Sequence, residues 1–329
     1  MIPAIRILYA VLTVFALIQP DIAQSEAWPT KPVRWIQSSA PGSSADIIGR
    51  ILSDRLGAKW GLQVVSDSRP GAAGNIAAQA AARAAPDGYN YFLAVASTLA
   101  VNPYTFKSLP FDVERDFVPV INIGISPFMI AVNPALPVNS MAELIAFAQA
   151  NPGKLSFATS GARNLQHITG EMLKLRSGIN IVNVPYKGSP FAAQDTIAGR
   201  TELYIDSVPA MSSHVGSDRL RIIGVTSRDR LPGFETIPTV AEAVPGFAAV
   251  GWFALLAPTG TPYEALARVN KDLNDILALT EVSELLRRNG VFNGGGTLDE
   301  VQRFLRSERT LWRRRPSKRQ EYNPSDGLG

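Results

Sequence analysis

The chain has no cysteine among its 329 residues and only two histidines. The absence of cysteine excludes disulfide bonds, thiolate metal sites, cysteine nucleophiles and a lipid anchor on cysteine. The sequence also lacks the H-E-x-x-H, G-x-S-x-G, Walker A and G-x-G-x-x-G patterns. It therefore shows neither a zinc-protease helix, a hydrolase nucleophile elbow nor a nucleotide-binding loop. We expect no cofactor and no metal.

Long apolar runs are also missing, with one exception near the N-terminus. Residues 7–18 are uncharged and apolar, but this run is shorter than the roughly 20 residues that span a bilayer. Arg6 precedes the run, and small residues at positions 23–27 offer cleavage points. The pattern predicts a cleaved signal peptide over residues 1–27 and hence a periplasmic protein. A short buried helix and an uncleaved anchor are the alternatives.

The formal net charge of +4 is unevenly distributed. Residues 1–27 carry a net charge of −1 and residues 303–329 a net charge of +5, so residues 28–302 are neutral. A nucleic-acid-binding domain would instead spread Lys and Arg over one face, so we expect no nucleic-acid partner. Residues 313–329 combine basic charge with few large apolar side chains, which predicts a disordered basic tail. Attachment of this tail to anionic lipid is an alternative role.

Short apolar runs alternate with helical patterns through most of the chain. This alternation predicts parallel sheets with helices on both faces. About 302 residues would remain after signal cleavage, which suits two domains better than one core. The expected strands are residues 33–36, 63–65, 91–95, 129–132, 155–158, 181–184, 203–205, 220–226 and 252–257.

Two turns rich in small residues each connect a predicted strand to a predicted helix. They cover residues 40–46 and 158–162. Such a turn points backbone N–H groups at whatever lies above the helix N-terminus, where the helix dipole adds about half a positive charge. In parallel sheets, ligands bind outside the carboxyl ends of the strands. The two turns therefore suggest two lobes that close on one acidic ligand.

The polar residues at these strand ends are mostly neutral hydroxyls. Next to free N–H groups, hydroxyls suit a carboxylate that is held by dipoles. Each of them could instead be an ordinary helix N-cap; it is their recurrence that favours a binding role. They are Ser38, Ser39, Ser43, Ser44, Ser97, Thr98, Thr159 and Ser160.

His167 lies in a helical pattern with Glu171 four residues later. Two such ligands do not make a metal site, so a structural histidine near the cleft is the better interpretation. We find no nucleophile, base and orienting group together, and we expect no catalytic residue.

Several short motifs occur in an order that resembles one known family. They include Trp28-Pro29-Thr30-Lys31-Pro32, Arg69-Pro70-Gly71-Ala72, Ala85-Pro86-Asp87-Gly88-Tyr89, Val184-Pro185-Tyr186-Lys187-Gly188 and Ala257-Pro258-Thr259-Gly260. Each motif is weak alone, but the ordered set from about Trp28 to Trp312 resembles the Bug, or TctC-like, solute receptors of tripartite tricarboxylate transporters.

The resemblance implies a two-lobed periplasmic binding protein of the Venus-flytrap type. Each lobe would be a mostly parallel sheet flanked by helices. Lobe 1 would comprise residues 28–124 and 250–312, and lobe 2 residues 125–249. The protein, expected to be a monomer, would capture a small carboxylate between its lobes and deliver it to membrane permease subunits. An enzyme that acts on a small carboxylate in the same cleft and an orphan receptor that serves signalling are the alternatives.

The resemblance also places the binding residues. In lobe 1 these are Ser38, Ser39, Gly42, Ser43, Ser44, Ser97 and Thr98. In lobe 2 they are Thr159, Ser160, Gly161, His167, Tyr186, Lys187, Gly188 and Asp206. The family commonly has an aromatic residue where Ser39 stands, and a glycine where Ser43 and Ala73 stand. The ligand therefore cannot be inferred from that of a relative.

Overall fold

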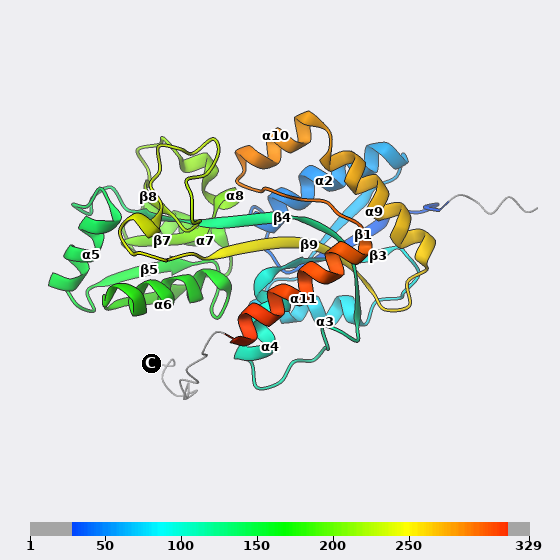
Figure 1. Cartoon of the computed structure of the whole chain (residues 1–329), viewed down its shortest axis with the longest axis horizontal. Helices are drawn as coiled ribbons and strands as arrows, with labels where there is room; N and C mark the ends of the chain where they lie inside the picture. The colour runs from blue at the N-terminus through cyan, green and yellow to red at the C-terminus, as the bar shows by residue number, and fades with distance from the viewer. Residues whose placement is uncertain (1–27, 315–329) are drawn as a thin grey trace, which may run out of the picture.

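The structure is a computed structural model that describes residues 28–314. Two groups of strands lie at opposite ends of the molecule, and two long strands run side by side between them (Figure 1). The predicted signal peptide lies outside the described residues, as does the predicted tail apart from its first two positions. No helix in the described range is long and apolar enough to cross a membrane.

Lobe 1 is built around β1, the first strand of the described chain. β1 pairs in parallel with β2 on one side and with β3 on the other. One face of these strands packs against α2 and α9 through a cluster that includes Trp35, Ile48, Leu52 and Val269. The elements are β1 (Val33–Gln37), α2 (Ser44–Trp60), β2 (Val64–Ser68), η1 (Ala72–Gly74), α3 (Asn75–Ala82), β3 (Asn90–Val95), η2 (Ser97–Val101), α4 (Asn102–Thr105), α9 (Tyr263–Leu277), α10 (Thr280–Arg288) and α11 (Leu298–Arg314).

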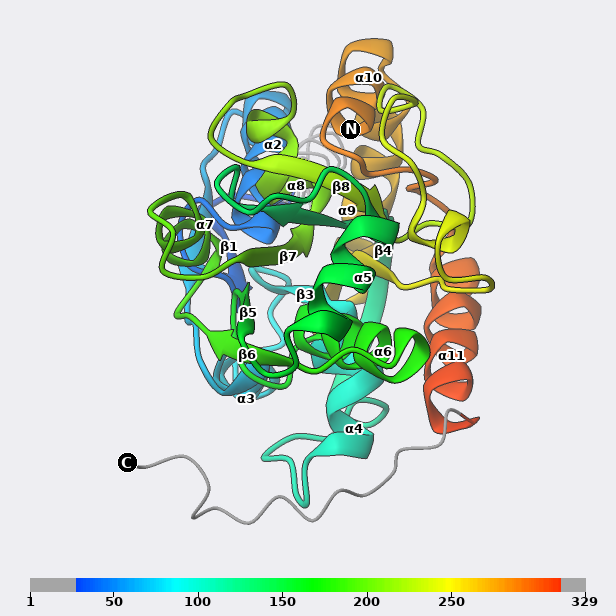
Figure 2. The same cartoon turned by 90° about the vertical axis from the view of Figure 1, so that its left-hand side faces the viewer.

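Lobe 2 contains a parallel group in which β5 lies between β6 and β7. Phe157 on one face of β5 packs with α5 and α6, whereas Ala158 on the other face packs with α7 and α8. Figure 2 shows α5 and α6 on one side of these strands and α7 on the other. The elements are α5 (Met141–Ala150), β5 (Leu155–Thr159), α6 (Leu165–Ser177), β6 (Ile181–Pro185), α7 (Ser189–Ile197), β7 (Leu203–Ser207), α8 (Val208–Met211), η3 (Ser212–His214), β8 (Arg221–Val225) and η4 (Val240–Glu242).

The two crossing strands are β4 (Phe117–Val132) and β9 (Val250–Pro258). β4 pairs antiparallel with β9 as far as Pro127, and from Phe128 it pairs with β7 and β8. The strand order is β2-β1-β3-β9-β4-β7-β5-β6, with β8 also on β4. The parallel strands that the sequence predicts are thus joined by two antiparallel ones. Because β4 belongs to both groups, the lobes share one sheet.

The strand prediction of residues 129–132 was too short, because β4 begins twelve residues earlier, at Phe117. The missed part contains Pro119, Gly124 and Pro127, which ordinarily argue against a strand. The pairing with β9 accommodates them through register shifts between Pro119 and Ile121 and between Asn122 and Gly124.

Thr226 holds the crossing together. It is fully buried, and its hydroxyl accepts a hydrogen bond from the Phe128 backbone N–H (2.8 Å) and donates one to the Ala249 carbonyl (2.6 Å). Its own backbone also bonds to both residues. One side chain therefore ties β4 to the segment that enters β9.

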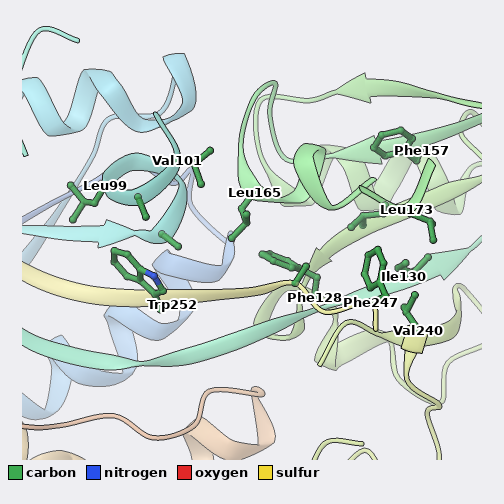
Figure 3. Close-up of a cluster of buried hydrophobic side chains, with 14 of the residues drawn as sticks. Leu99, Val101, Phe128, Ile130, Phe157, Leu165, Leu173, Val240, Phe247 and Trp252 are labelled. Atoms are coloured by element: carbon green, nitrogen blue, oxygen red, sulfur yellow. The ribbon is translucent and has the colours of Figure 1, made fainter. Parts of the chain in front are cut away.

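The main core is continuous from one lobe to the other. Figure 3 shows Leu99 and Trp252 on the lobe 1 side, Phe157 and Leu173 in lobe 2, and Phe128 and Leu165 between them. This cluster includes Phe128 and Ile130 of β4 and Trp252 and Ala254 of β9, so it packs against the strands that connect the lobes.

Candidate functional site

A cavity of about 670 Å³ lies between the lobes. This volume is in the range of small-molecule sites. The cavity lies where loops leave β1, β3, β5, β6 and β7, and its apolar wall includes Phe128, Leu165, Trp252 and Phe253. The strand-end location is the one expected for open α/β sheets.

The first lobe presents the N-terminus of α2 to this cavity. Ser43 is the N-cap residue, but its hydroxyl makes no capping bond and instead accepts from the Ser189 N–H of lobe 2 (3.2 Å). Ser44 and Ala45 line the cavity at the first two helical positions. Backbone N–H groups at such positions have no partner within the helix. The start of α2 therefore offers N–H donors and the positive end of its dipole.

Asp46 fixes the conformation of this turn. Its buried carboxylate accepts from the Gly42 N–H (2.9 Å), the Gln37 amide (3.0 Å) and the Arg50 guanidinium (2.9 Å). Burial raises the pKa of Asp46, but these hydrogen bonds outweigh burial and hold the pKa below its usual value. Asp46 is thus a charged anchor for the turn.

The second lobe presents the N-terminus of α6. The Asn164 side chain caps this helix by accepting from the His167 N–H (3.0 Å). Leu165 and Gln166 occupy the first two helical positions and line the cavity. Just before the cap, Arg163 has a left-handed backbone with φ of 61°, and its N–H donates to His167 Nδ1 (3.0 Å). His167 therefore shapes the turn.

A third helix, α7, begins beside the cavity. Its N-cap residue Gly188 has φ of 135°, and a Cβ there would lie 3.0 Å from the Cβ of Ala40 in lobe 1. Lys187 and Tyr186 precede it on the cavity wall. The Tyr186 hydroxyl donates to Asp195 (2.9 Å); burial and this carboxylate together raise the pKa of Tyr186.

The loop after β2 forms part of the cavity wall and has a strained backbone. Ala72 and Ala73 both adopt positive φ, 48° and 53°, which is costly for residues with a Cβ. The Ala73 carbonyl accepts from the Asn102 amide (2.9 Å) and the Thr98 hydroxyl (3.3 Å). A Cβ on Gly74 would lie 2.2 Å from the Thr98 hydroxyl, so only glycine fits there.

The electrostatic character of the wall is positive. Among the described residues that line the cavity, Arg163 and Lys187 are the charged ones, and none is Asp or Glu. The acid Asp206 lies beneath the wall, fully buried, and accepts from the Gln166 amide (3.0 Å) and the Tyr204 hydroxyl (2.8 Å). Burial raises the pKa of Asp206, although these hydrogen bonds oppose it.

Most of the residues that the sequence analysis placed at the site line the cavity. They are Ser38, Ser39, Ser43, Ser44, Ser97, Ser160, Gly161, Tyr186, Lys187 and Gly188. Whether they bind a ligand stays a prediction.

The remaining predicted residues do not line the cavity, and a role for them as ligand contacts stays a prediction. They are Gly42, Thr98, Thr159, His167 and Asp206. The physical reason is that their polar groups serve the loops. The Thr159 hydroxyl, for example, donates to the Gly161 carbonyl and lies 3.0 Å from Asn183 Oδ1, while Asp206 holds Gln166 in place.

Sequence reasoning missed several wall residues. Arg163, Asn164 and Gln166 directly follow the second turn, and a site extended as far as the helix start would have included them. Phe106, Phe128 and Trp252 gave no such signal, because apolar residues in a strand or loop resemble core positions.

The described residues contain no group of three His, Asp or Glu side chains that could hold a metal ion. His167 Nε2 does lie 3.7 Å from Glu171, but the pair has no third ligand among these residues.

A family model for the receptor of the tripartite tricarboxylate transporter family matches residues 48–316. The chain belongs to this family. It is 36% identical to a UPF0065 protein of Bordetella bronchiseptica, over 89% of this chain and 87% of the relative. It is 34% identical to BugT of Bordetella pertussis, over 88% of this chain and 89% of BugT.

Solved structures agree with this assignment. The structure of Rpa4515 from R. palustris with adipate is 34% identical, with a TM-score of 0.84 over 87% of this chain and 96% of that chain. The periplasmic binding protein BugD is 27% identical, with a TM-score of 0.81 over 87% of this chain and 96% of that chain. The predicted two-lobed α/β fold and the resemblance to the Bug family are thus confirmed. This receptor is a solute-binding protein, and the comparisons give the enzyme alternative no support.

Proposed function

We propose that this receptor binds a small carboxylate in the cavity between its lobes and delivers it to a membrane permease. The observation that carries the proposal is the convergence of three helix N-termini, those of α2, α6 and α7, on a cavity without acidic lining residues among those described. Each N-terminus favours an anion by its dipole, and the first turns of α2 and α6 add N–H groups that have no partner within the helix.

The wall supplies the rest of a carboxylate site. Ser44 and Ser160 place hydroxyls beside the N–H groups, and Arg163 and Lys187 add positive charge. The apolar residues Phe128, Trp252 and Phe253 suit the carbon skeleton of an organic acid. The adipate in the related Rpa4515 structure supports the same ligand class. We propose the wall residues predicted above as ligand contacts, with Gln166 and Asn164 added.

The proposed cycle begins with export through the signal peptide at residues 1–27, after which the receptor acts in the periplasm as a monomer. Lobe 1 would be residues 28–124 and 250–312, and lobe 2 residues 125–249. These boundaries fall close to the point where β4 changes partners, between Pro127 and Phe128, and to the start of β9 at Val250. Closure on the ligand would create the form that the permease recognises.

A thermal-shift panel of small acids tests the ligand class. The panel contains mono- and dicarboxylates from acetate to adipate, with the corresponding amides as neutral controls. At a concentration of 100 Kd, a binding acid stabilises the protein by about 2.7 kcal/mol. We expect at least one acid to raise the melting temperature and its amide to leave it unchanged. If only neutral compounds stabilise the protein, or no acid does, the proposal is wrong.

Lysine variants then test the cavity itself. Lys187 is exposed on the cavity wall, whereas Lys154 is an exposed lysine of lobe 2 that does not line the cavity. We expect Lys187→Gln to weaken binding of the acid about two- to fivefold, the usual effect of an exposed charge. Lys154→Gln is the matched control and should have no effect. Equal effects of the two variants would show only a general influence of net charge.

A further inference from the structure

One contact between the lobes is made by two side chains and does not involve the helix N-termini. The Arg163 guanidinium carbon lies 5.3 Å from the centre of the Phe106 ring. Arg163 belongs to the loop before α6 in lobe 2, and Phe106 follows α4 in lobe 1. Both residues line the cavity. This distance lies within the range of a cation–π interaction, so the pair bridges the two lobes at the cavity wall.

The structure positions both partners from within their own lobes. Arg163 keeps its left-handed turn because its N–H donates to His167 Nδ1 in the first turn of α6. Phe106 leaves α4 in an extended conformation, and its N–H donates to the Asn102 carbonyl (3.0 Å). The buried Asn102 in turn holds the Ala73 carbonyl of the strained loop. Each partner is therefore tied to a loop that lines the cavity.

Two hydrogen bonds between the lobes are of a different kind. The Ser44 and Ser207 hydroxyls share a hydrogen bond, and the Ser43 hydroxyl accepts from the Ser189 N–H. These are small neutral groups that exchange easily with water. The Arg163–Phe106 pair instead spans the cleft with a long side chain and an aromatic ring. Separation of the lobes would break it completely, because a cation–π interaction needs the charge within about 6 Å of the ring.

We propose that Arg163 and Phe106 form a latch that favours the closed arrangement of the lobes before any ligand binds. The latch sets the fraction of receptor that is closed and, through it, the apparent affinity for every ligand. A cation–π pair at a partly exposed site contributes about a fivefold factor to the closed-to-open ratio, equivalent to about 1 kcal/mol. The inference rests on the proposed receptor function only in assuming that the lobes open and close.

A simpler role for Arg163 would be to contact the ligand alone. That role requires nothing of Phe106, whose ring carries no charge and no hydrogen-bonding group. The two roles therefore predict different results for a variant that lacks the ring but keeps the arginine. They also differ in the absence of ligand, because only the latch would then change the closed-to-open ratio.

Distance measurement by electron paramagnetic resonance tests the latch without a ligand. Since the chain has no native cysteine, cysteines introduced at Arg83 in lobe 1 and Val182 in lobe 2, both exposed, would be the only labelling sites. We expect Phe106→Leu and Arg163→Gln each to lower the closed-to-open ratio about fivefold. The double variant should show no further loss, because either change alone breaks the pair. Phe106→Trp introduces an indole ring, which binds cations better than phenyl, and should retain the closed population.

Two results would overturn the latch. One is a distance distribution unchanged by both single variants; the other is a change with Arg163→Gln but none with Phe106→Leu. The same labelled proteins with each acid of the thermal-shift panel separate this outcome from that of the proposed function. If no acid shifts the distribution, the result counts against the proposed carboxylate ligand, and a ligand-free response to both variants would still support the latch.

Discussion

The buried hydroxyl of Thr226 offers the sharpest test of how the lobes are joined. Replacement by valine keeps the shape of the side chain but removes the group that accepts from the Phe128 N–H and donates to the Ala249 carbonyl. Both bonds are short, at 2.8 and 2.6 Å, and Thr226 is fully buried. The change therefore leaves a donor of β4 and an acceptor beside β9 without their side-chain partner.

The expected cost follows from these two groups. An unsatisfied buried donor or acceptor costs about 1–3 kcal/mol. The Ala249 N–H and the Thr226 backbone remain bonded in the variant, so only the two side-chain losses count, and they should sum to about 2–6 kcal/mol of the free energy of unfolding. Thr226→Ser keeps the hydroxyl and loses one buried methyl group, which should cost about 1 kcal/mol.

Urea denaturation at 25 °C measures this difference. The matched control is Thr169→Val in α6, where an equally buried hydroxyl donates only to the Leu165 carbonyl of its own helix. That carbonyl keeps its helical hydrogen bond, so we expect the control to cost less than about 1 kcal/mol. If Thr226→Val were as mild as the control, the hydroxyl would not hold the crossing strands.

Further predictions concern the strained loop, the charge network of lobe 1 and the approach of the lobes. Ala73→Gly should stabilise the protein by about 0.5–1 kcal/mol, because glycine accepts the positive φ without strain, and a lower melting temperature would contradict the strain. Burial raises the pKa of Asp272, but hydrogen bonds from Lys59, Trp60 and Arg268 outweigh burial and hold the pKa below its usual value of 3.8. The Asp272 carboxylate therefore stabilises the fold above that pH. Asp272→Asn should therefore cost about 1–3 kcal/mol at pH 7 and progressively less below pH 4, and a pH-independent loss in urea titrations would refute this linkage. Gly188→Ala places a Cβ 3.0 Å from Ala40 across the cleft and should weaken acid binding in calorimetry, with unchanged affinity as the contrary result.

Much of the fold could be predicted because its signals are local. The small-residue turns mark helix starts, and short apolar runs mark the parallel strands. The first twelve residues of β4 escaped prediction because their prolines and glycine are typical strand breakers, and the pairing with β9 accommodates them. Long-range pairing is not encoded in local pattern, so the shared sheet could not be foreseen.

The candidate site could likewise be predicted only in part. The turns and their serines were predicted to face one cavity, and the structure brings them there. Asp206 and His167 bond to neighbouring loop and helix groups, which residue type could not reveal, because it says nothing about whether a polar group faces a cavity or a neighbouring loop. Phe106 was missed because its importance depends on a contact across the cleft with Arg163, more than fifty residues away in the chain.

The central claim is that helix N-termini and two cations make this cavity a carboxylate site. Isothermal titration calorimetry with the best-binding acid of the panel and its neutral amide tests it most directly. The account predicts saturable binding of the acid and at least tenfold weaker binding of the amide, since only the acid carries the charge that the cavity is built to hold. Equal affinity for the two would contradict it.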